Sequence, residues 1–83
     1  MYMNRLSLMH KFLQMGFTFD DYSLYGEKKF DQLILEYENG RWKYYEMGEK
    51  WSVTQIKYFA TEDEACNFYD AKMFGFWKYK VQF

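Results

Sequence analysis

A predicted β-hairpin in the middle of this sequence limits what the chain can fold into. Asn39-Gly40 separates Gln32–Glu38, which is rich in Leu, Ile and Tyr, from Arg41–Glu46, which carries one Trp and two Tyr. Asn-Gly between two such runs favours a type I′ turn, because both central residues of that turn need a positive φ. A second turn cluster at 47–50 leads into Trp51–Phe59. The sequence therefore predicts a three-strand antiparallel meander.

Two further strands are expected outside this meander. Tyr22–Gly26 is a short strand candidate, and a turn at 26–29 would pair it with the first strand of the hairpin. Near the C-terminus, the aromatic and apolar residues of Trp77–Phe83 alternate with Lys78, Lys80 and Gln82, and this period of two is typical of a strand. The alternative for this last segment is a helix that continues past Gly75.

Two helices are predicted, one at each end of the sheet region. Asn4 can cap a helix over 4–15 and Gly16 can end it, while Thr61 and Glu64 form a capping box for a second helix over 61–74. The apolar face of the first helix consists of Leu6, Leu8, Met9, Phe12, Leu13 and Met15. The expected fold is a single α+β domain over 1–83: an antiparallel meander of about four strands flanked by an N-terminal and a C-terminal helix, with the possible extra C-terminal strand.

Charge and composition exclude several classes of function. The net charge is −1, whereas a nucleic-acid-binding protein needs a basic surface to neutralise phosphates. No apolar run approaches the roughly 20 residues of a membrane span, and the N-terminus lacks the features of a signal peptide. The single cysteine, Cys66, allows no internal disulfide. We therefore expect a cytoplasmic protein that binds neither nucleic acid nor membrane.

The residues that enzymes use for catalysis are scarce in this chain. It has one His and one Cys, His10 and Cys66, and they fall on different predicted helices. A buried structural thiol is the expectation for Cys66, because cysteine is among the most buried residue types; a nucleophile pair of Cys66 and His10 is the alternative. No calcium-loop spacing and no Gly-rich phosphate loop are present. The sequence predicts no enzyme activity, no cofactor and no metal site.

Aromatic and acidic residues indicate a binding surface instead. A quarter of the residues, 25%, are aromatic, which is more than so small a core can hold, so some of them must reach the surface. Glu36 and Glu38 point to the same face of the predicted sheet. A solvated sheet face is the simple interpretation, and a surface that docks a basic partner protein is the functional one.

The order of motifs resembles the small immunity proteins of bacterial polymorphic-toxin systems. In several such families an "ILE…NG.W.VYY.E.G" hairpin precedes "F.sEeeAc.y" at the start of a helix. The matching residues here are Ile34, Leu35, Glu36, Asn39, Gly40, Trp42, Tyr44, Tyr45, Glu46 and Gly48, followed by Phe59, Glu62, Glu64, Ala65, Cys66 and Tyr69. This resemblance implies a protein that binds a cognate toxin and neutralises it, by covering the toxin's active site or an essential surface.

If the protein is an immunity protein, the exposed sheet face and its adjoining loops should contact the toxin. The expected partner-binding residues are Asp20, Asp21, Tyr25, Glu36, Glu38, Tyr45, Glu46 and Trp51. Two alternatives remain open: a phage-type small inhibitor or adaptor that binds a host enzyme, and a self-associating module that pairs through the C-terminal strand. The protein is accordingly expected to be a monomer or a homodimer.

Overall fold

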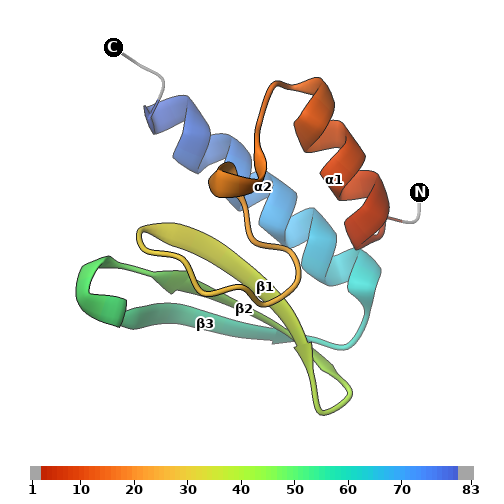
Figure 1. Ribbon diagram of the computed structural model, residues 1–83. Coiled ribbons are helices and arrows are strands. Elements are labelled where there is room, and N and C mark those ends of the chain that lie inside the picture. The colour runs from red at the N-terminus through yellow and green to blue at the C-terminus, as the bar shows by residue number, and fades with distance from the viewer. Residues whose placement is uncertain (1–2, 81–83) are drawn as a thin grey trace.

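The predicted hairpin lies at the centre of the fold in the computed structural model, which describes residues 3–80. Two helices and a three-strand sheet make up an α+β domain (Figure 1). The elements in chain order are α1 (Arg5–Gln14), η1 (Phe19–Asp21), β1 (Gln32–Glu38), β2 (Arg41–Met47), η2 (Glu49–Trp51), β3 (Val53–Phe59) and α2 (Glu62–Lys80), where η marks a short 3-10 helix.

The sheet has the order β1-β2-β3, and both pairs of neighbouring strands are antiparallel. Glu38 pairs with Arg41, so only Asn39 and Gly40 form the loop between β1 and β2. Their φ angles are 54° and 77°, as a type I′ turn requires. The predicted three-strand meander is therefore confirmed.

Strand β3 contains a bulge in its middle. Tyr44 pairs with Lys57 whereas Glu46 pairs with Thr54, so Gln55 and Ile56 together lie opposite Tyr45. Gln55 has a φ of 58°, which is uncommon for a residue other than glycine. Such a bulge bends a strand and interrupts the regular row of backbone groups along its free edge.

The predicted fourth strand of the meander is not present, because Tyr22–Gly26 runs parallel to β1 rather than antiparallel. Ser23 forms an isolated parallel bridge with Ile34. The backbone N–H of Leu35 donates to the Ser23 carbonyl at 2.9 Å, and the Gly26 N–H donates to the Leu35 carbonyl at 2.9 Å. Parallel strands cannot be joined by a tight turn. The turn residues at 26–29 instead begin a longer return to the start of β1.

The hydroxyl group of Tyr69 on α2 completes this parallel contact. It accepts a hydrogen bond from the Ser23 N–H at 3.0 Å and donates one to the Leu33 carbonyl at 2.8 Å. The next hydrogen bond of a parallel ladder would join these two backbone groups directly. A buried side chain from the helix layer therefore links the Tyr22–Gly26 segment to the edge of β1.

Helix α1 begins as predicted but buries less of its apolar face than expected. Asn4 and Ser7 form a capping box, and Gly16 follows the helix with a φ of 90°. Leu8 and Phe12 are buried in the core. Three residues that the sequence assigned to the same wide face are exposed: Leu6, Leu13 and Met15. The reason is that α1 packs on one side only, against α2 and the Tyr22–Gly26 segment.

Helix α2 also begins as predicted, and it continues past Gly75 to Lys80. Thr61 Oγ1 accepts from the Glu64 N–H at 3.2 Å. The predicted strand is wrong over residues 77–80, and residues 81–83 lie outside the described part of the chain. One glycine inside a helix costs only about 1 kcal/mol, whereas a lone strand needs a sheet edge to pair with. The edge of β1 is already occupied by Tyr22–Gly26.

Both helices lie on the same side of the sheet (Figure 1). They run in the same direction, since Arg5 forms an ion pair with Glu62 at 3.8 Å and Lys11 forms one with Asp70 at 2.6 Å. The core between helices and sheet consists of Leu8, Phe12, Tyr22, Leu24, Leu33, Leu35, Trp42, Tyr44, Ala65, Cys66, Tyr69 and Met73. The opposite face of the sheet, called the outer face below, carries no helix in residues 3–80.

Candidate interaction surface

The outer face presents a different kind of residue from each of its three strands. Side chains alternate between the two faces of a sheet, so the register assigns them to a face. Strand β1 contributes acidic groups, Glu36 and Glu38, beside Ile34; β2 contributes Arg41, Lys43, Tyr45 and Met47; and β3 contributes Val53, Ile56 and Tyr58. The outer face is thus acidic on β1, basic on β2 and apolar on β3.

Five large apolar side chains are exposed on β3 and at the adjoining end of the sheet. The exposed fractions are 43% for Val53, 48% for Ile56, 50% for Tyr58, 51% for Trp51 and 55% for Phe30. The rings of Phe30 and Trp51 contact each other with centroids 4.1 Å apart. We call these five residues the outer patch. A group of exposed apolar residues of this kind marks a binding site more often than isolated exposed residues do.

The loop before β3 holds Trp51 in a strained conformation. Lys50 and Trp51 have φ angles of 62° and 61°, in the left-handed region that residues other than glycine rarely occupy. Each left-handed residue costs about 1–2 kcal/mol, and such strain is concentrated at functional sites. In this backbone conformation the ring of Trp51 contacts Phe30, and about half of the Trp51 side chain remains exposed. Tryptophan is the side chain most enriched among residues that dominate binding energy.

Three residues of the outer face are buried and form a small second core. It consists of Ile34, Tyr45 and Met47, which are 0%, 2% and 3% exposed. The hydroxyl oxygen of Tyr45 is buried, and it faces the Glu36 carboxylate without a partner at normal hydrogen-bond geometry among the described residues. Burial raises the pKa of Tyr45 to about 12, together with the charge and hydrogen-bonding of Glu36 and the charge of Glu38. This hydroxyl therefore stays protonated next to two acidic side chains.

Three of the sequence-predicted contact residues come together on the outer face, and a fourth lies at its end. Glu36 and Glu38 are successive outer-face residues of β1, and Tyr45 on β2 lies diagonally across from Glu36. Trp51 belongs to the outer patch. Glu38 is exposed and Glu36 is half-buried, while Tyr45 contributes a buried ring with its hydroxyl group directed toward the acidic pair.

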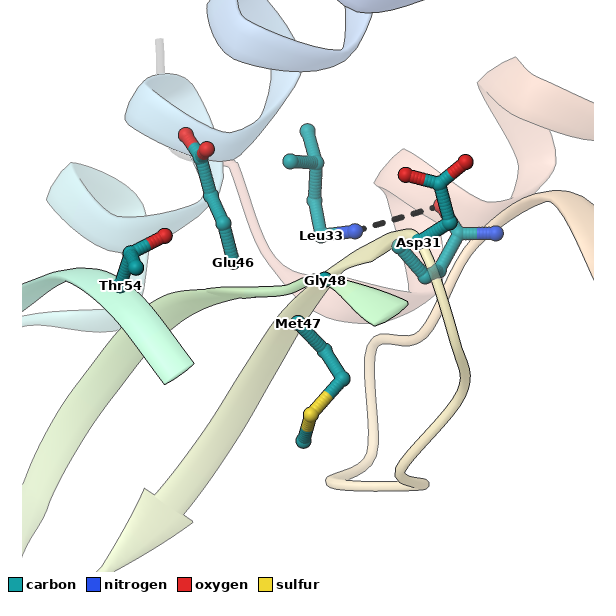
Figure 2. Close-up of a pocket in the computed structure, with 7 residues that line it drawn as sticks. Asp31, Leu33, Glu46, Met47, Gly48 and Thr54 are labelled. Carbon is teal, nitrogen blue, oxygen red and sulfur yellow. Dashed lines mark hydrogen bonds between the residues drawn. The ribbon is translucent and has the colours of Figure 1, made fainter. Parts of the chain in front are cut away.

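Glu46, another predicted contact residue, points to the helix side of the sheet. Its carboxylate accepts a hydrogen bond from the Tyr44 hydroxyl at 2.8 Å, and this contact together with burial raises the pKa of Tyr44. Glu46 also lines a small pocket with Asp31, Leu33 and Thr54, and Figure 2 shows it on the same side as Leu33 and opposite to Met47. The pocket holds about 100 Å³. Sites for organic ligands typically measure roughly 300–1,000 Å³, so this one has room only for a few waters.

Two of the remaining three predicted contact residues support local structure outside the outer patch. Asp21 caps η1, because its carboxylate accepts the Thr18 N–H at 2.7 Å, and Asp20 beside it is exposed. The exposed ring of Tyr25 stacks on the guanidinium group of Arg5 at 4.3 Å. These contacts within the chain are enough to give Asp21 and Tyr25 structural roles, with no partner protein involved.

The residues that could support catalysis are separated or buried. Cys66 is fully buried, and burial, with a smaller contribution from Glu62, raises the pKa of its thiol to about 12. A nucleophilic cysteine needs a lowered pKa, so the burial and raised pKa of Cys66 disfavour it as a nucleophile. His10 is exposed on α1. Within residues 3–80, no three His, Cys, Asp or Glu side chains gather to hold a metal ion.

None of the helices within residues 3–80 is both long enough and apolar enough to span a membrane.

Sequence reasoning missed most of the outer patch. Val53, Ile56 and Tyr58 fall in the predicted third strand without a predicted exposure, and Phe30 falls between the predicted turn at 26–29 and the strand that begins at Gln32. The available signal was the position of β3 as the last strand of a meander, since an edge strand has a neighbour on one side only. The bulge at Gln55, which sets the orientation of Ile56, left no sign in the sequence.

No protein-family model, curated protein or solved structure matches this chain, so the resemblance to immunity proteins stays a prediction.

Proposed function

We propose that this protein is an immunity protein that binds a cognate bacterial toxin and neutralises it by covering the toxin's active site or an essential surface. The observation that carries the proposal is the outer patch, in which strained backbone at Lys50 and Trp51 holds a half-exposed tryptophan against Phe30. A rigid aromatic side chain at the surface loses little entropy when a partner covers it.

The outer face, rather than the sheet edge, is the surface that suits a protein partner. Adding a strand to a sheet requires a regular row of free backbone groups. The bulge at Gln55 and Ile56 divides β3 into two short pieces, and the edge of β1 is occupied by the Tyr22–Gly26 segment. A partner that packs on the face, by contrast, contacts Val53, Ile56 and Tyr58 through their side chains.

The same geometry disfavours two other functions. Self-association was expected to use a C-terminal strand, but residues 77–80 belong to α2. A small organic ligand lacks a suitable site in the pocket beside Glu46, which holds only about 100 Å³. A phage-type inhibitor of a host enzyme remains the alternative, and it would use the same kind of exposed patch.

A growth-rescue experiment tests the proposal. The wild-type protein is used as bait, and each captured polypeptide is expressed alone and together with it. We expect one captured polypeptide to stop growth when expressed alone, and co-expression of the wild-type protein to restore growth. The double variant Trp51→Ala/Ile56→Ala should lose both capture and rescue, because truncating central aromatic and apolar contacts typically costs about 2 kcal/mol or more of binding.

The matched control is Leu6→Ala/Leu13→Ala, which truncates two similarly exposed apolar residues on α1, 56% and 46% exposed. It should rescue growth as well as the wild type does. Rescue by the Trp51→Ala/Ile56→Ala variant at wild-type level would contradict the proposed surface. If the captured polypeptide is not toxic but is an enzyme whose activity the protein blocks, the inhibitor alternative replaces the immunity proposal.

A further inference from the structure

We infer that Glu36, Glu38 and the Tyr45 hydroxyl form a site for one arginine side chain of the partner protein. This inference rests on the proposed function and names the chemistry that the partner must present beside the outer patch. The apolar residues of β3 would supply contact area, and the acidic site on β1 would fix the orientation of the complex.

The first argument is that the cations of the outer face lie on aromatic rings and form no ion pair with these two carboxylates. Arg41 pairs with Glu38 across the strands, and Lys43 pairs with Glu36. The Arg41 guanidinium nevertheless stacks on the ring of Tyr58 at 4.3 Å, and the Lys43 ammonium group lies 5.1 Å from the centre of the Tyr45 ring.

The ion pairs among residues 3–80 lie elsewhere, between Arg5 and Glu62 and between Lys11 and Asp70. Within this described part of the chain, no ion pair shorter than 4.0 Å joins Glu36 or Glu38 to a cation. Two neighbouring carboxylates without a cation attract a positively charged group from a partner.

The second argument comes from the Tyr45 hydroxyl. Tyr45 is 2% exposed, and its hydroxyl oxygen faces the Glu36 carboxylate without a partner at normal hydrogen-bond geometry among the described residues. Buried polar groups in proteins nearly always have such a partner, and an exception calls for an explanation. Tyr45 pairs with Ile34, so Glu36 lies diagonally across from Tyr45 on the same face and Glu38 is the next outer-face residue of β1. A long side chain that packs on this face could therefore contact all three groups.

Arginine fits this site better than lysine does. Its planar guanidinium carries five N–H donors in a fixed arrangement, and it can bind two carboxylates at once. A phenol oxygen can accept one of the remaining N–H groups. Arginine is also less strongly hydrated than lysine, which lowers the cost of moving it next to the apolar outer patch.

Gly26 holds one wall of the site in place. A Cβ atom added at this glycine would lie 3.2 Å from the Glu36 Cβ and 3.5 Å from its carboxylate oxygen Oε2. The backbone at Gly26 therefore packs directly on the Glu36 side chain and limits its rotation. A carboxylate that is already positioned loses less entropy when it binds a partner.

Titration of the labelled protein with N-acetyl-L-arginine amide, followed by NMR, tests the arginine site directly. We expect saturable shift changes centred on Glu36, Glu38 and Tyr45. The Glu36→Gln/Glu38→Gln variant should weaken binding by at least roughly tenfold, because hydrogen bonds between charged groups are stronger than neutral ones. The uncharged isostere N-acetyl-L-citrulline amide should not bind. The control Asp20→Asn, which removes an exposed carboxylate of η1, should bind like the wild type.

Equal binding of the citrulline compound, or unchanged binding by the Glu36→Gln/Glu38→Gln variant, would overturn the inference. The two proposals fail in distinguishable ways. If Trp51→Ala/Ile56→Ala abolishes growth rescue while Glu36→Gln/Glu38→Gln leaves the affinity for the toxin unchanged, the immunity function stands and the arginine site is wrong. If the arginine compound binds as expected but no outer-patch variant affects rescue, the immunity function is wrong and the cation site stands.

Discussion

Replacing Tyr69 with phenylalanine isolates the contribution of one hydroxyl group to the free energy of unfolding. This hydroxyl group connects helix α2 with the Tyr22–Gly26 segment and the edge of β1. The Tyr69 hydroxyl bonds the Ser23 N–H and the Leu33 carbonyl, and all three groups are buried. The variant keeps the aromatic ring, so it opens no large cavity and leaves the contacts of Phe12 and Tyr44 with that ring unchanged. The loss is therefore confined to the two hydrogen bonds.

The expected magnitude follows from the two backbone groups that lose their partner. Leaving a buried donor or acceptor unsatisfied costs about 1–3 kcal/mol per group. Partial relaxation brings the sum to about 2–4 kcal/mol in the free energy of unfolding, which is a large share of the 5–15 kcal/mol typical of small domains. With an m value of about 1 kcal/mol/M in urea, the unfolding midpoint should fall by about 2 M or more.

Urea unfolding followed by tryptophan fluorescence measures this loss, and Tyr22→Phe is the matched control. The Tyr22 hydroxyl is buried without a hydrogen-bond partner among the described residues, so its removal should leave the midpoint unchanged or raise it. A midpoint for Tyr69→Phe within about 0.5 M of the wild type would refute the reasoning. It would mean that Ser23 and Leu33 can form the parallel-ladder hydrogen bond directly.

Three other perturbations test separate features of the structure. Gly26→Ala should lower the free energy of unfolding by about 1–2 kcal/mol, because Gly26 has a φ of 84° and an added Cβ would press on Glu36. Urea unfolding measures this loss. The control Gly16→Ala should cost less, because no atom lies within 4 Å of a Cβ added at Gly16. Lys50→Gly should raise the free energy of unfolding by about 1 kcal/mol by relieving the left-handed strain, and an unchanged midpoint would show that the loop carries no strain. Raising the pH should destabilise the fold from about pH 9 upward, because burial raises the pKa of Cys66 from 9.0 and that of Tyr45 from 10.0 to about 12 each, so the folded state holds protons that the unfolded state releases. Urea midpoints between pH 8 and 11.5 check this, and a flat profile would contradict it.

The elements that the sequence predicted well are those whose signals are local. The Asn39-Gly40 turn needs only two residues that accept a positive φ, and the register of β1 and β2 follows from it. Thr61 and Glu64 determine the start of α2 through contacts within one helical turn. The parity of the strands also assigned Glu36 and Glu38 to the same face of the sheet. Each of these outcomes depends on residues fewer than about ten positions apart.

The elements that the sequence predicted wrongly depend on partners far away in the chain. The direction of Tyr22–Gly26 is coupled to Tyr69, which lies 46 positions beyond Ser23. The alternation of Trp77–Phe83 indicated a strand, but a strand forms only where a sheet edge is free, and residues 77–80 continue α2 instead. The exposure of Leu6 and Leu13 likewise depends on how few elements pack against α1.

The sequence by itself determined the α+β class, the central hairpin, both helix starts and the acidic pair on one sheet face. Only the tertiary structure decided the parallel course of Tyr22–Gly26, the outer patch and the burial of the Tyr45 hydroxyl beside Glu36. The physical reason is that turns and caps are satisfied by neighbouring residues, whereas exposure and hydrogen-bond pairing are properties of the packed chain.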